Sequence, residues 1–340
     1  MEPGLSHTSG HLLDIENIKK YFPIRKGIIR KTVGWVQAID GVSLYISKGE
    51  ALGLVGESGC GKSTLGKCIL KLLEPTAGRI FFDGQDIGTM DCAQTKAYRK
   101  KVQAIFQDPY SSLNPRMSVA ELVGEPLLVH KLYSPAERLG KVENLLNKVG
   151  LSADHMPRFP HEFSGGQRQR IGIARALALE PDLIVCDEPV SALDVSVQAQ
   201  VINLLDDLKA EFDLSYLFIA HDLSVVEHVC DRIAVMYLGK VVEIAKDTQL
   251  YTNPLHPYTQ ALLSAIPQPV PRRQKKRMIL TGEVPSPINP PTGCRFHPRC
   301  PVRIEVCLHD PPLLRAVNSE HFVACHLVNK GSSLVLSLTA

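Results

Sequence analysis

The residues best suited to do chemistry form a glycine-rich run of eight: Gly56, Glu57, Ser58, Gly59, Cys60, Gly61, Lys62 and Ser63. The run matches the pattern G-x-x-x-x-G-K-[ST], in which the glycines let successive backbone N–H groups point at a phosphate. Lys62 would neutralise the β- and γ-phosphates, and the Ser63 hydroxyl would bind Mg²⁺. A glycine-rich turn before a helix can be purely structural, but the Lys-Ser pair is in register here. The run, with Thr64 after it, therefore predicts a nucleoside triphosphate site.

A second candidate site lies where an apolar stretch, residues 183–186, leads into two adjacent carboxylates, Asp187 and Glu188. Ligands of parallel sheets bind at the carboxyl ends of the strands, where these acids would stand. We expect Asp187 to hold Mg²⁺ and Glu188 to polarise the water that attacks the γ-phosphate. An Asp-Glu pair after a strand is more often a surface turn. The phosphate-binding run upstream is what favours the catalytic interpretation.

Local sequence patterns predict the elements that would position these residues. Runs rich in Val, Ile, Leu and Tyr predict strands, and apolar side chains at helical spacing predict helices. The predicted strands are 12–18, 36–46, 50–55, 183–186 and 216–220. The predicted helices are 62–73, 118–130, 135–149, 164–179 and 197–212. The alternation of strand and helix in the second half predicts an α/β fold with a parallel sheet.

Three motifs in a fixed order resemble those of the ATP-binding cassette family, from about residue 12 to residue 260. They are the phosphate-binding run, the Asp187–Glu188 pair, and the segment Ser164-Gly165-Gly166-Gln167 shortly before that pair. The resemblance implies a P-loop NTPase cassette that hydrolyses ATP. Its expected fold has a RecA-like core, an antiparallel β subdomain and a helical subdomain that carries the signature segment, Ser164 to Gln167.

The resemblance also implies a role for the signature segment and its neighbours. The N–H groups and dipole of the helix that the segment begins would engage the γ-phosphate held by a second subunit. Asp194, in the stretch 191–194, would lie at that subunit interface. Two subunits would therefore be needed for efficient hydrolysis.

Three further residues match smaller marks of the family. His221 would hold the γ-phosphate and orient the catalytic acid, and Gln107 would reach Mg²⁺ and the attacking water while coupling to a membrane partner. Tyr21 resembles the aromatic residue that stacks on adenine, although an insertion of basic residues before residues 37–40 departs from the family pattern. Each residue alone is more often an ordinary loop or core residue, so only order and spacing carry these roles.

Composition sets limits on the class of protein. The 340 residues are 44% hydrophobic and 21% charged, which is typical of a globular protein, and the length suggests roughly two domains. No segment approaches the ~20 apolar residues of a membrane span, and the N-terminus lacks a signal-peptide pattern. The net charge of +3 and the absence of a basic helix give no indication of nucleic-acid binding. We expect a cytosolic protein whose membrane role depends on partners.

The last part of the chain resembles the oligopeptide and dipeptide branch of cassette importers, on the residues His256-Pro257-Tyr258-Thr259 and a cysteine pattern downstream. Four of the nine cysteines gather there: Cys294, Cys300, Cys307 and Cys325. In that branch such a tail can hold an iron–sulfur cluster, and four thiolates suit [4Fe–4S] or Zn²⁺. The absence of paired C-x₂-C motifs favours iron, with His297, His321 and His326 as alternative ligands. A metal-free or disulfide-bonded tail is the remaining alternative.

These observations predict a flexible N-terminus over residues 1–11, an ATPase domain over 12–265 and a Pro- and Cys-rich extension over 266–340, with a basic cluster at 272–277 in its linker. The resemblance implies an importer ATPase at the cytoplasmic face of the membrane. Its partners would be two permease subunits, a second cassette subunit and, indirectly, an external solute-binding protein. Peptides are the expected solute, with nickel or other small solutes open. A soluble cassette ATPase acting on DNA or ribosomes, an exporter subunit and a non-catalytic subunit are less favoured.

Overall fold

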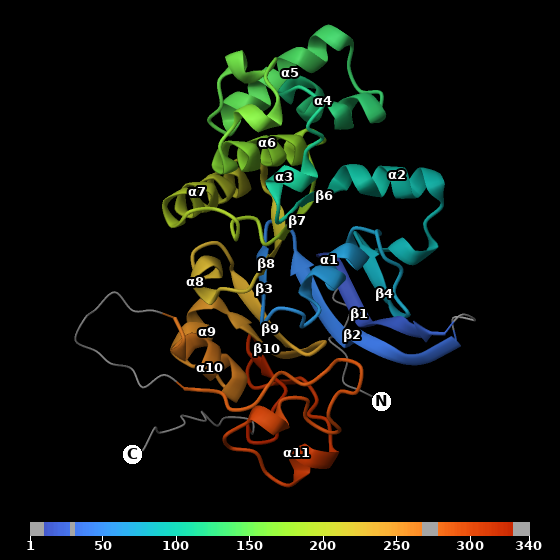
Figure 1. The fold of residues 1–340 in the computed structure, drawn as a ribbon, viewed down its shortest axis with the longest axis vertical. Helices are drawn as coiled ribbons and strands as arrows, with labels where there is room; N and C mark the ends of the chain where they lie inside the picture. Colours follow the sequence, from blue (N-terminus) through green and yellow to red (C-terminus); the bar gives the residue numbers. More distant parts are fainter. Residues whose placement is uncertain (1–9, 28–30, 267–277, 329–340) are drawn as a thin grey trace, which may run out of the picture. The chain divides into compact units, whose positions relative to one another are not determined.

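The computed structural model describes residues 10–27, 31–266 and 278–328 (Figure 1). The chain forms two compact units. The first consists of Met1–Tyr45, Leu52–Gly88 and His221–Ala340, and the second of Ile46–Ala51 and Thr89–Ala220. The described part of the predicted extension, residues 278–328, therefore shares its unit with most of residues 10–88. The predicted flexible N-terminus, except for its last two residues, and the basic cluster at 272–277 lie outside the described residues.

An antiparallel sheet forms one part of the first unit, with the strand order β2-β1-β4-β5. Its strands are β1 (His11–Lys26), β2 (Lys31–Ser47), β4 (Ala77–Phe82) and β5 (Gln85–Asp86). Leu13 of β1 pairs with Phe82, and Ile15 pairs with Ile80. These side chains are buried because alternate residues of a strand point to the same face. This is the antiparallel β subdomain that the family resemblance implies.

A second group of strands in the first unit includes β3, the strand that directly precedes the phosphate-binding run. Strand β3 (Ala51–Val55) is parallel to β9 (Arg232–Tyr237), and β10 (Lys240–Lys246) returns antiparallel to β9. The tail adds β12 (Phe322–Val323) to β10, and β11 (Arg315–Ala316) pairs with β12. Helices α1 (Lys62–Ile69), α9 (Asp247–Thr252) and α10 (Pro257–Ser264) belong to the same unit. The extension is thus joined to the core by strand pairing.

The second unit contains three parallel strands, β6 (Val102–Ile105), β7 (Leu183–Asp187) and β8 (Ser215–Ala220), in the order β6-β7-β8. Strand β8 is buried along its whole length, as expected for a parallel strand covered on both faces. The helices of the unit are α2 (Cys92–Lys101), α3 (Pro109–Ser112), α4 (Val119–Val129), α5 (Pro135–Lys148), α6 (Gly165–Leu177) and α7 (Val195–Phe212). Helix α8 (Leu223–Val226) follows β8 in the chain.

Most predicted elements agree with these bounds to within a few residues. The main difference is helix α1, which ends at Ile69 rather than near residue 73, because Lys71 takes a left-handed backbone conformation (φ 55°) that stops the helix. The long β1 and β2 also extend well beyond the predicted strands 12–18 and 36–46. The α/β class is confirmed. Within the described ranges, no helix is both long enough and apolar enough to span a bilayer.

Candidate functional site

The glycine-rich run forms a tight loop between β3 and α1, as its sequence pattern predicts. Gly56 has φ 151° and Gly61 has φ 110°, a region of backbone conformation that favours glycine. A Cβ atom at Gly56 would lie 2.1 Å from the carbonyl oxygen of Met236, and one at Gly61 would lie 2.2 Å from that of Ala38. Both glycines are therefore required by the close approach of neighbouring backbone.

Lys62 begins helix α1 and turns its side chain back into this loop. The side chain is buried, and its Nζ donates hydrogen bonds to the carbonyl oxygens of Gly56 (2.7 Å) and Glu57 (3.0 Å). Ser63 and Thr64 are half-buried in the first turn of the same helix. The loop thus combines an ammonium group with the N-terminal end of a helix, which is a suitable environment for a polyphosphate.

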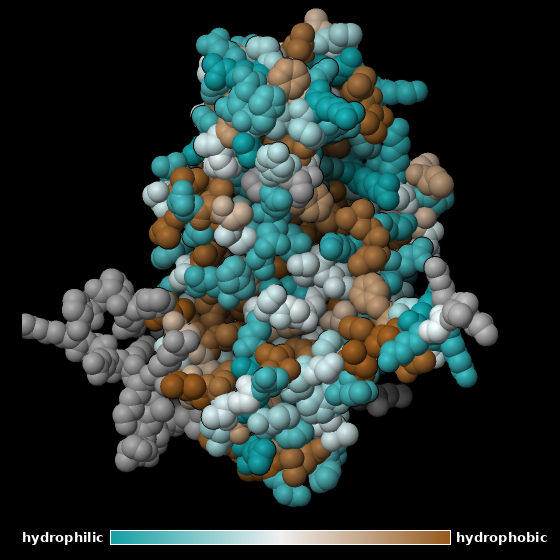
Figure 2. Space-filling model, in the orientation of Figure 1, coloured by the Kyte–Doolittle hydropathy of each residue, from teal (hydrophilic) through white to brown (hydrophobic). Residues whose placement is uncertain are grey.

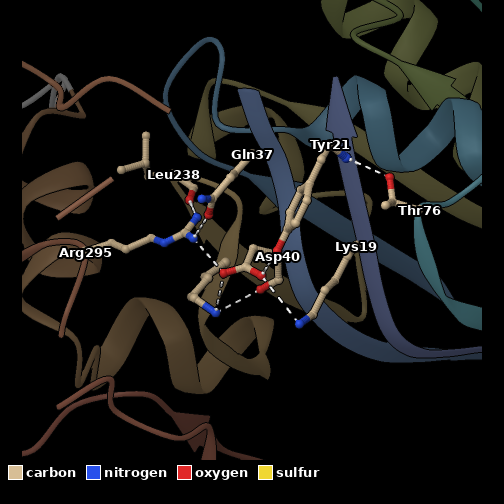
Figure 3. A network of polar contacts seen from close by, with 8 residues as sticks. Lys19, Tyr21, Gln37, Asp40, Thr76, Leu238 and Arg295 are labelled. Atoms are coloured by element: carbon tan, nitrogen blue, oxygen red, sulfur yellow. Dashed lines mark hydrogen bonds and ion pairs between the residues drawn. The ribbon is translucent and has the colours of Figure 1, made fainter. Parts of the chain in front are cut away.

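Tyr21 takes part in a polar network centred on Asp40 (Figure 3). The Tyr21 hydroxyl donates to Oδ1 of Asp40 (2.6 Å), while Lys240 and Arg295 approach Oδ2 at 3.1 Å and 2.6 Å. Burial, followed by the hydrogen bond to Asp40, raises the pKa of Tyr21 to about 12. Burial by itself would raise the pKa of Asp40, but the Tyr21 hydrogen bond and the two cations outweigh it and lower that pKa. Tyr21 is thus held in one orientation by its hydroxyl.

The second unit brings Gln107 and Glu188 together. Asp187 is the last residue of β7, and Glu188 follows it with φ 49°, a left-handed conformation that is strained for a residue with a side chain. The backbone N–H of Glu188 donates to the carbonyl oxygen of Ile219 (3.0 Å), which fixes the turn. Gln107, two residues after β6, donates from Nε2 to Oε2 of Glu188 (3.0 Å). Parallel pairing of β6 with β7 places these strand ends at one edge.

The signature segment begins helix α6. Ser164 is the N-cap: its Oγ accepts from the N–H of Gln167 (3.3 Å), and Oε1 of Gln167 accepts from the N–H of Ser164 (3.0 Å). A Cβ atom at Gly166 would lie 2.4 Å from Cγ1 of Val197, so this glycine permits close packing on α7. Asp194 is the exposed N-cap of α7. Ser164 and Asp194 are both exposed near the packed ends of two helices.

The predicted site residues therefore fall into two groups. The loop of residues 56–64 and Tyr21 belong to the first unit, whereas Gln107, Asp187, Glu188, the signature segment and Asp194 belong to the second. His221 directly follows β8 and is counted with the first unit.

Sequence reasoning missed Arg295 and Arg299 of the tail. Arg295 reaches Asp40, as described above, and Arg299 forms two hydrogen bonds with the Glu57 carboxylate, at 2.7 and 3.0 Å. The hydrogen bonds to Glu57 are the largest cause of a raised pKa for Arg299. The two arginines lie between Cys294 and Cys300, in a stretch whose cysteines suggest a metal site. No sequence rule pairs them with residues more than 240 positions away.

The structure gives no support to a metal site in the tail. Among the residues that it describes, no group of three or more His, Cys, Asp or Glu side chains is arranged to hold a metal ion. Burial is the main cause of raised thiol pKa values for Cys294 and Cys300, both to about 11. All nine cysteines are free thiols, so the described chain contains no disulfide.

Cys60 and Cys186 are buried as packing residues, and burial raises the pKa of each.

Two family models match the chain. The model described as "ABC transporter" matches residues 39–191, and the model described as "Oligopeptide/dipeptide transporter, C-terminal region" matches residues 242–307. The second match covers the HPYT segment and three of the four tail cysteines.

Curated relatives agree over almost the whole chain. The oligopeptide transport ATP-binding protein AppF of Bacillus subtilis is 56% identical over 321 residues, covering 93% of this chain and 97% of that protein. The putative oligopeptide transport ATP-binding protein YkfD of the same organism is 53% identical, covering 93% and 95%. A putative peptide import ATP-binding protein of Brucella ovis is 51% identical, covering 94% and 98%.

Solved structures of ATP-binding cassettes share the fold. The cbiO1 protein of Clostridium perfringens, part of an ABC transporter complex, has a TM-score of 0.61 at 27% identity, covering 71% of this chain and 91% of that one. The cassette MJ0796, solved as a dimer in a post-hydrolysis state with ADP and phosphate, has a TM-score of 0.61 at 29% identity, covering 69% and 98%. Because the motifs, the relatives and the fold agree, the chain belongs to the ABC transporter family, as an ATPase of its oligopeptide and dipeptide branch.

Proposed function

We propose that this chain drives the import of di- or oligopeptides across a membrane by binding and hydrolysing ATP. The observation that carries the proposal is the match of residues 242–307 to the C-terminal region of oligopeptide and dipeptide transporters. It is supported by the names of relatives that are 51–56% identical over nearly their full length. The same match argues against an exporter subunit and against a cassette that acts on DNA or ribosomes. Nickel or another small solute is the second candidate.

In this proposal the first unit binds the nucleotide. The loop N–H groups and Lys62 bind the β- and γ-phosphates, Tyr21 stacks on adenine, and His221 contacts the γ-phosphate. The Ser63 hydroxyl would bind Mg²⁺, and the family resemblance gives the same role to the Asp187 carboxylate and the Gln107 amide. Oxygen donors of these kinds suit this hard cation. The ion would neutralise charge on the phosphate oxygens.

The second unit activates water and recognises a second subunit. Glu188 accepts a proton from the attacking water or orients it, and the Gln107 amide holds the Glu188 carboxylate in place (3.0 Å). Ser164 to Gln167 and Asp194 contact the ATP bound to a second cassette. Closure of the two cassettes on two ATP molecules would drive the permease between inward-facing and outward-facing states, and hydrolysis would reset it.

The proposed partners are two permease subunits, a second cassette subunit and, indirectly, an external solute-binding protein, which places the chain at the cytoplasmic face of the membrane. Apolar side chains exposed on the helical region of the second unit support a protein partner there. They include Leu128 and Val129 of α4 and Leu139 of α5, which are 53–58% exposed. Figure 2 shows apolar side chains among hydrophilic ones over this region. A permease segment would cover apolar surface of this kind.

The test is reconstitution of the chain with its genomic-neighbour permeases, second cassette and binding protein in liposomes. We expect ATP-dependent uptake of labelled di- or oligopeptides and stimulation of ATP hydrolysis by peptide-loaded binding protein. Labelled nickel serves as the parallel substrate. Uptake of nickel without uptake of any peptide in a mixed peptide pool would overturn the peptide assignment but leave the ATPase assignment in place.

A finer proposal concerns the cysteines of the tail, Cys294, Cys300, Cys307 and Cys325, as ligands of a [4Fe–4S] cluster or Zn²⁺. Its support is the donor set, four cysteines within residues 294–325 of the sequence. The described side chains do not form a ligand group, and we assign no step of the cycle to a metal. Anaerobic purification with measurement of iron, sulfide and zinc per chain tests the proposal, and a preparation free of all three would refute it.

A further inference from the structure

The phosphate-binding loop contains an acidic residue, Glu57, directly after its first glycine. A carboxylate beside a polyphosphate is repulsive because both are negatively charged. The only ammonium group of the loop itself is that of Lys62, and it donates to the carbonyl oxygens of Gly56 and Glu57 rather than to the Glu57 carboxylate. A positive charge that balances Glu57 would therefore favour the binding of ATP.

Arg299 of the tail supplies that balance. Its Nη1 and Nη2 atoms donate to Oε2 and Oε1 of Glu57 at 2.7 and 3.0 Å, the bidentate geometry that makes Arg–carboxylate pairs strong. The Arg299 side chain is only 8% exposed, and that of Glu57 is 27% exposed. The pair is therefore shielded from the screening that weakens surface ion pairs.

Packing holds Arg299 in this position. The guanidinium lies over the ring of Tyr237, 5.9 Å from the ring centroid. Phe296, three residues earlier, is buried and contacts Tyr237 and Tyr258 with ring centroids 5.2 and 5.4 Å apart. The short segment between Phe296 and Arg299 is thus anchored on strand β9 and helix α10.

Helix α10, which precedes the tail, also fixes the backbone of the acidic residue. The N–H of Glu57 donates to the hydroxyl of Tyr258 (2.9 Å), a fully buried residue of the HPYT segment. Both the main chain and the side chain of Glu57 are therefore bound by residues from the C-terminal third of the protein. These contacts direct the carboxylate toward the tail.

We propose that Arg299 is a positioning residue for ATP binding: it neutralises Glu57 and holds the carboxylate on the side of the tail, so that the loop presents positive charge to the phosphates. Without Arg299, an unpaired and partly buried carboxylate would remain in the phosphate-binding loop and would repel ATP. Arg299 itself does not touch the nucleotide. The tail would in this way set the affinity of the loop for ATP, whichever solute the importer carries.

The experiment measures the dissociation constant of Mg-ATP for the full chain, with a fluorescent ATP analogue as probe. We expect Arg299→Gln to raise the dissociation constant on the order of ten-fold, which corresponds to about 1.4 kcal/mol. Glu57→Gln should lower it, because the repulsive carboxylate charge is gone and the positive charge of Arg299 near the loop is no longer balanced. The double variant Arg299→Gln/Glu57→Gln should return to within roughly three-fold of the unsubstituted chain, since no net charge is left behind.

These outcomes separate charge balance from a purely structural contact. If Arg299 only anchors the tail, Glu57→Gln weakens ATP binding and the double variant binds as poorly as Arg299→Gln; either result would overturn the proposal. An unchanged dissociation constant for Mg-ATP in Arg299→Gln would also overturn the proposal. If Arg299→Gln fails to fold, the dissociation constant of Glu57→Gln alone still distinguishes charge balance from a purely structural contact. Arg303→Gln, an exposed arginine of the same tail, is the matched control and should bind ATP normally. No permease or peptide is needed, so the result is independent of the transport proposal.

Discussion

The side-chain amide of Gln107 donates a 3.0 Å hydrogen bond to the carboxylate of Glu188, joining residues that are 81 positions apart in the chain. Gln107 follows strand β6 and Glu188 follows strand β7, and parallel pairing of these strands brings the two ends to one edge of the sheet. Glu188 adopts a left-handed backbone conformation there (φ 49°). A strained residue held by a specific partner is the arrangement expected for a catalytic group.

Replacing the proposed catalytic acid should abolish turnover without loss of binding. Glu188→Gln keeps the size of the side chain but removes the group that accepts the proton, so we expect the rate of ATP hydrolysis in the assembled transporter to fall about 10²- to 10⁴-fold. The dissociation constant of the variant for ATP should stay within about two-fold of that of the unsubstituted chain. The measurement is steady-state hydrolysis beside equilibrium nucleotide binding. A normal hydrolysis rate would remove Glu188 from the mechanism.

Gln107 should act through Glu188 and Mg²⁺ rather than through nucleotide affinity. Gln107→Ala removes the hydrogen bond that orients the carboxylate, and we expect kcat to fall roughly ten-fold, equivalent to about 1.4 kcal/mol, with little change in KM for ATP. Gln103→Ala is a suitable control because Gln103 lies in the same strand region and contacts its own segment at Arg99. A rise in KM with unchanged kcat would contradict this role.

The loop glycines should differ sharply in their tolerance of a side chain. Gly61→Ala places a methyl group 2.2 Å from the Ala38 carbonyl oxygen, and we expect a loss of roughly 2 kcal/mol or more in the free energy of unfolding together with loss of ATP binding. Gly59→Ala is the matched control: it also has positive φ (79°), but nothing lies within 4 Å of the added atom. It should cost only about 1 kcal/mol of backbone strain. Urea unfolding and ATP titration of both variants give the comparison.

The Asp40 network should make the stability of the protein pH-dependent at acid pH. The folded pKa of Asp40 lies below its ordinary value of 3.8. Its contribution is therefore fully present above that value and is lost as pH falls through the folded pKa. Arg295→Gln removes one of the cations that lower the pKa, so this loss should begin at higher pH in the variant. Urea unfolding at several pH values between about 2 and 7 measures the shift.

A direct titration strengthens this test. The carboxyl resonance of Asp40, followed by NMR in the unsubstituted chain and in Arg295→Gln, should show a higher pKa in the variant. Lys19→Gln serves as a comparison, because its ammonium lies at 4.0 Å and is more exposed than Arg295. A larger effect from Lys19 than from Arg295 would contradict the assigned balance of charges.

The sequence by itself determined the chemistry of the phosphate loop and the identity of the elements around it. Gly56 and Gly61 adopt positive φ angles that favour glycine, and Lys62 follows Gly61 directly at the start of helix α1. These features of the loop are local in the chain, so they appear in the sequence as a fixed spacing. The buried strands 183–187 and 215–220 were equally predictable, because continuous apolar runs that end at a polar residue have few other interpretations.

Only the tertiary structure decided which distant residues support the site. Arg299 pairs with Glu57 and Arg295 with Asp40 across 242 and 255 positions, and nothing in the spacing of the tail points to either partner. The tail cysteines led the sequence interpretation toward a metal, whereas the described side chains form no group arranged to hold a metal ion. Two arginines between Cys294 and Cys300 instead form ion pairs with Asp40 and Glu57. The reason is physical: a local motif depends on neighbours in the chain, but an ion pair depends on where folding places two charges.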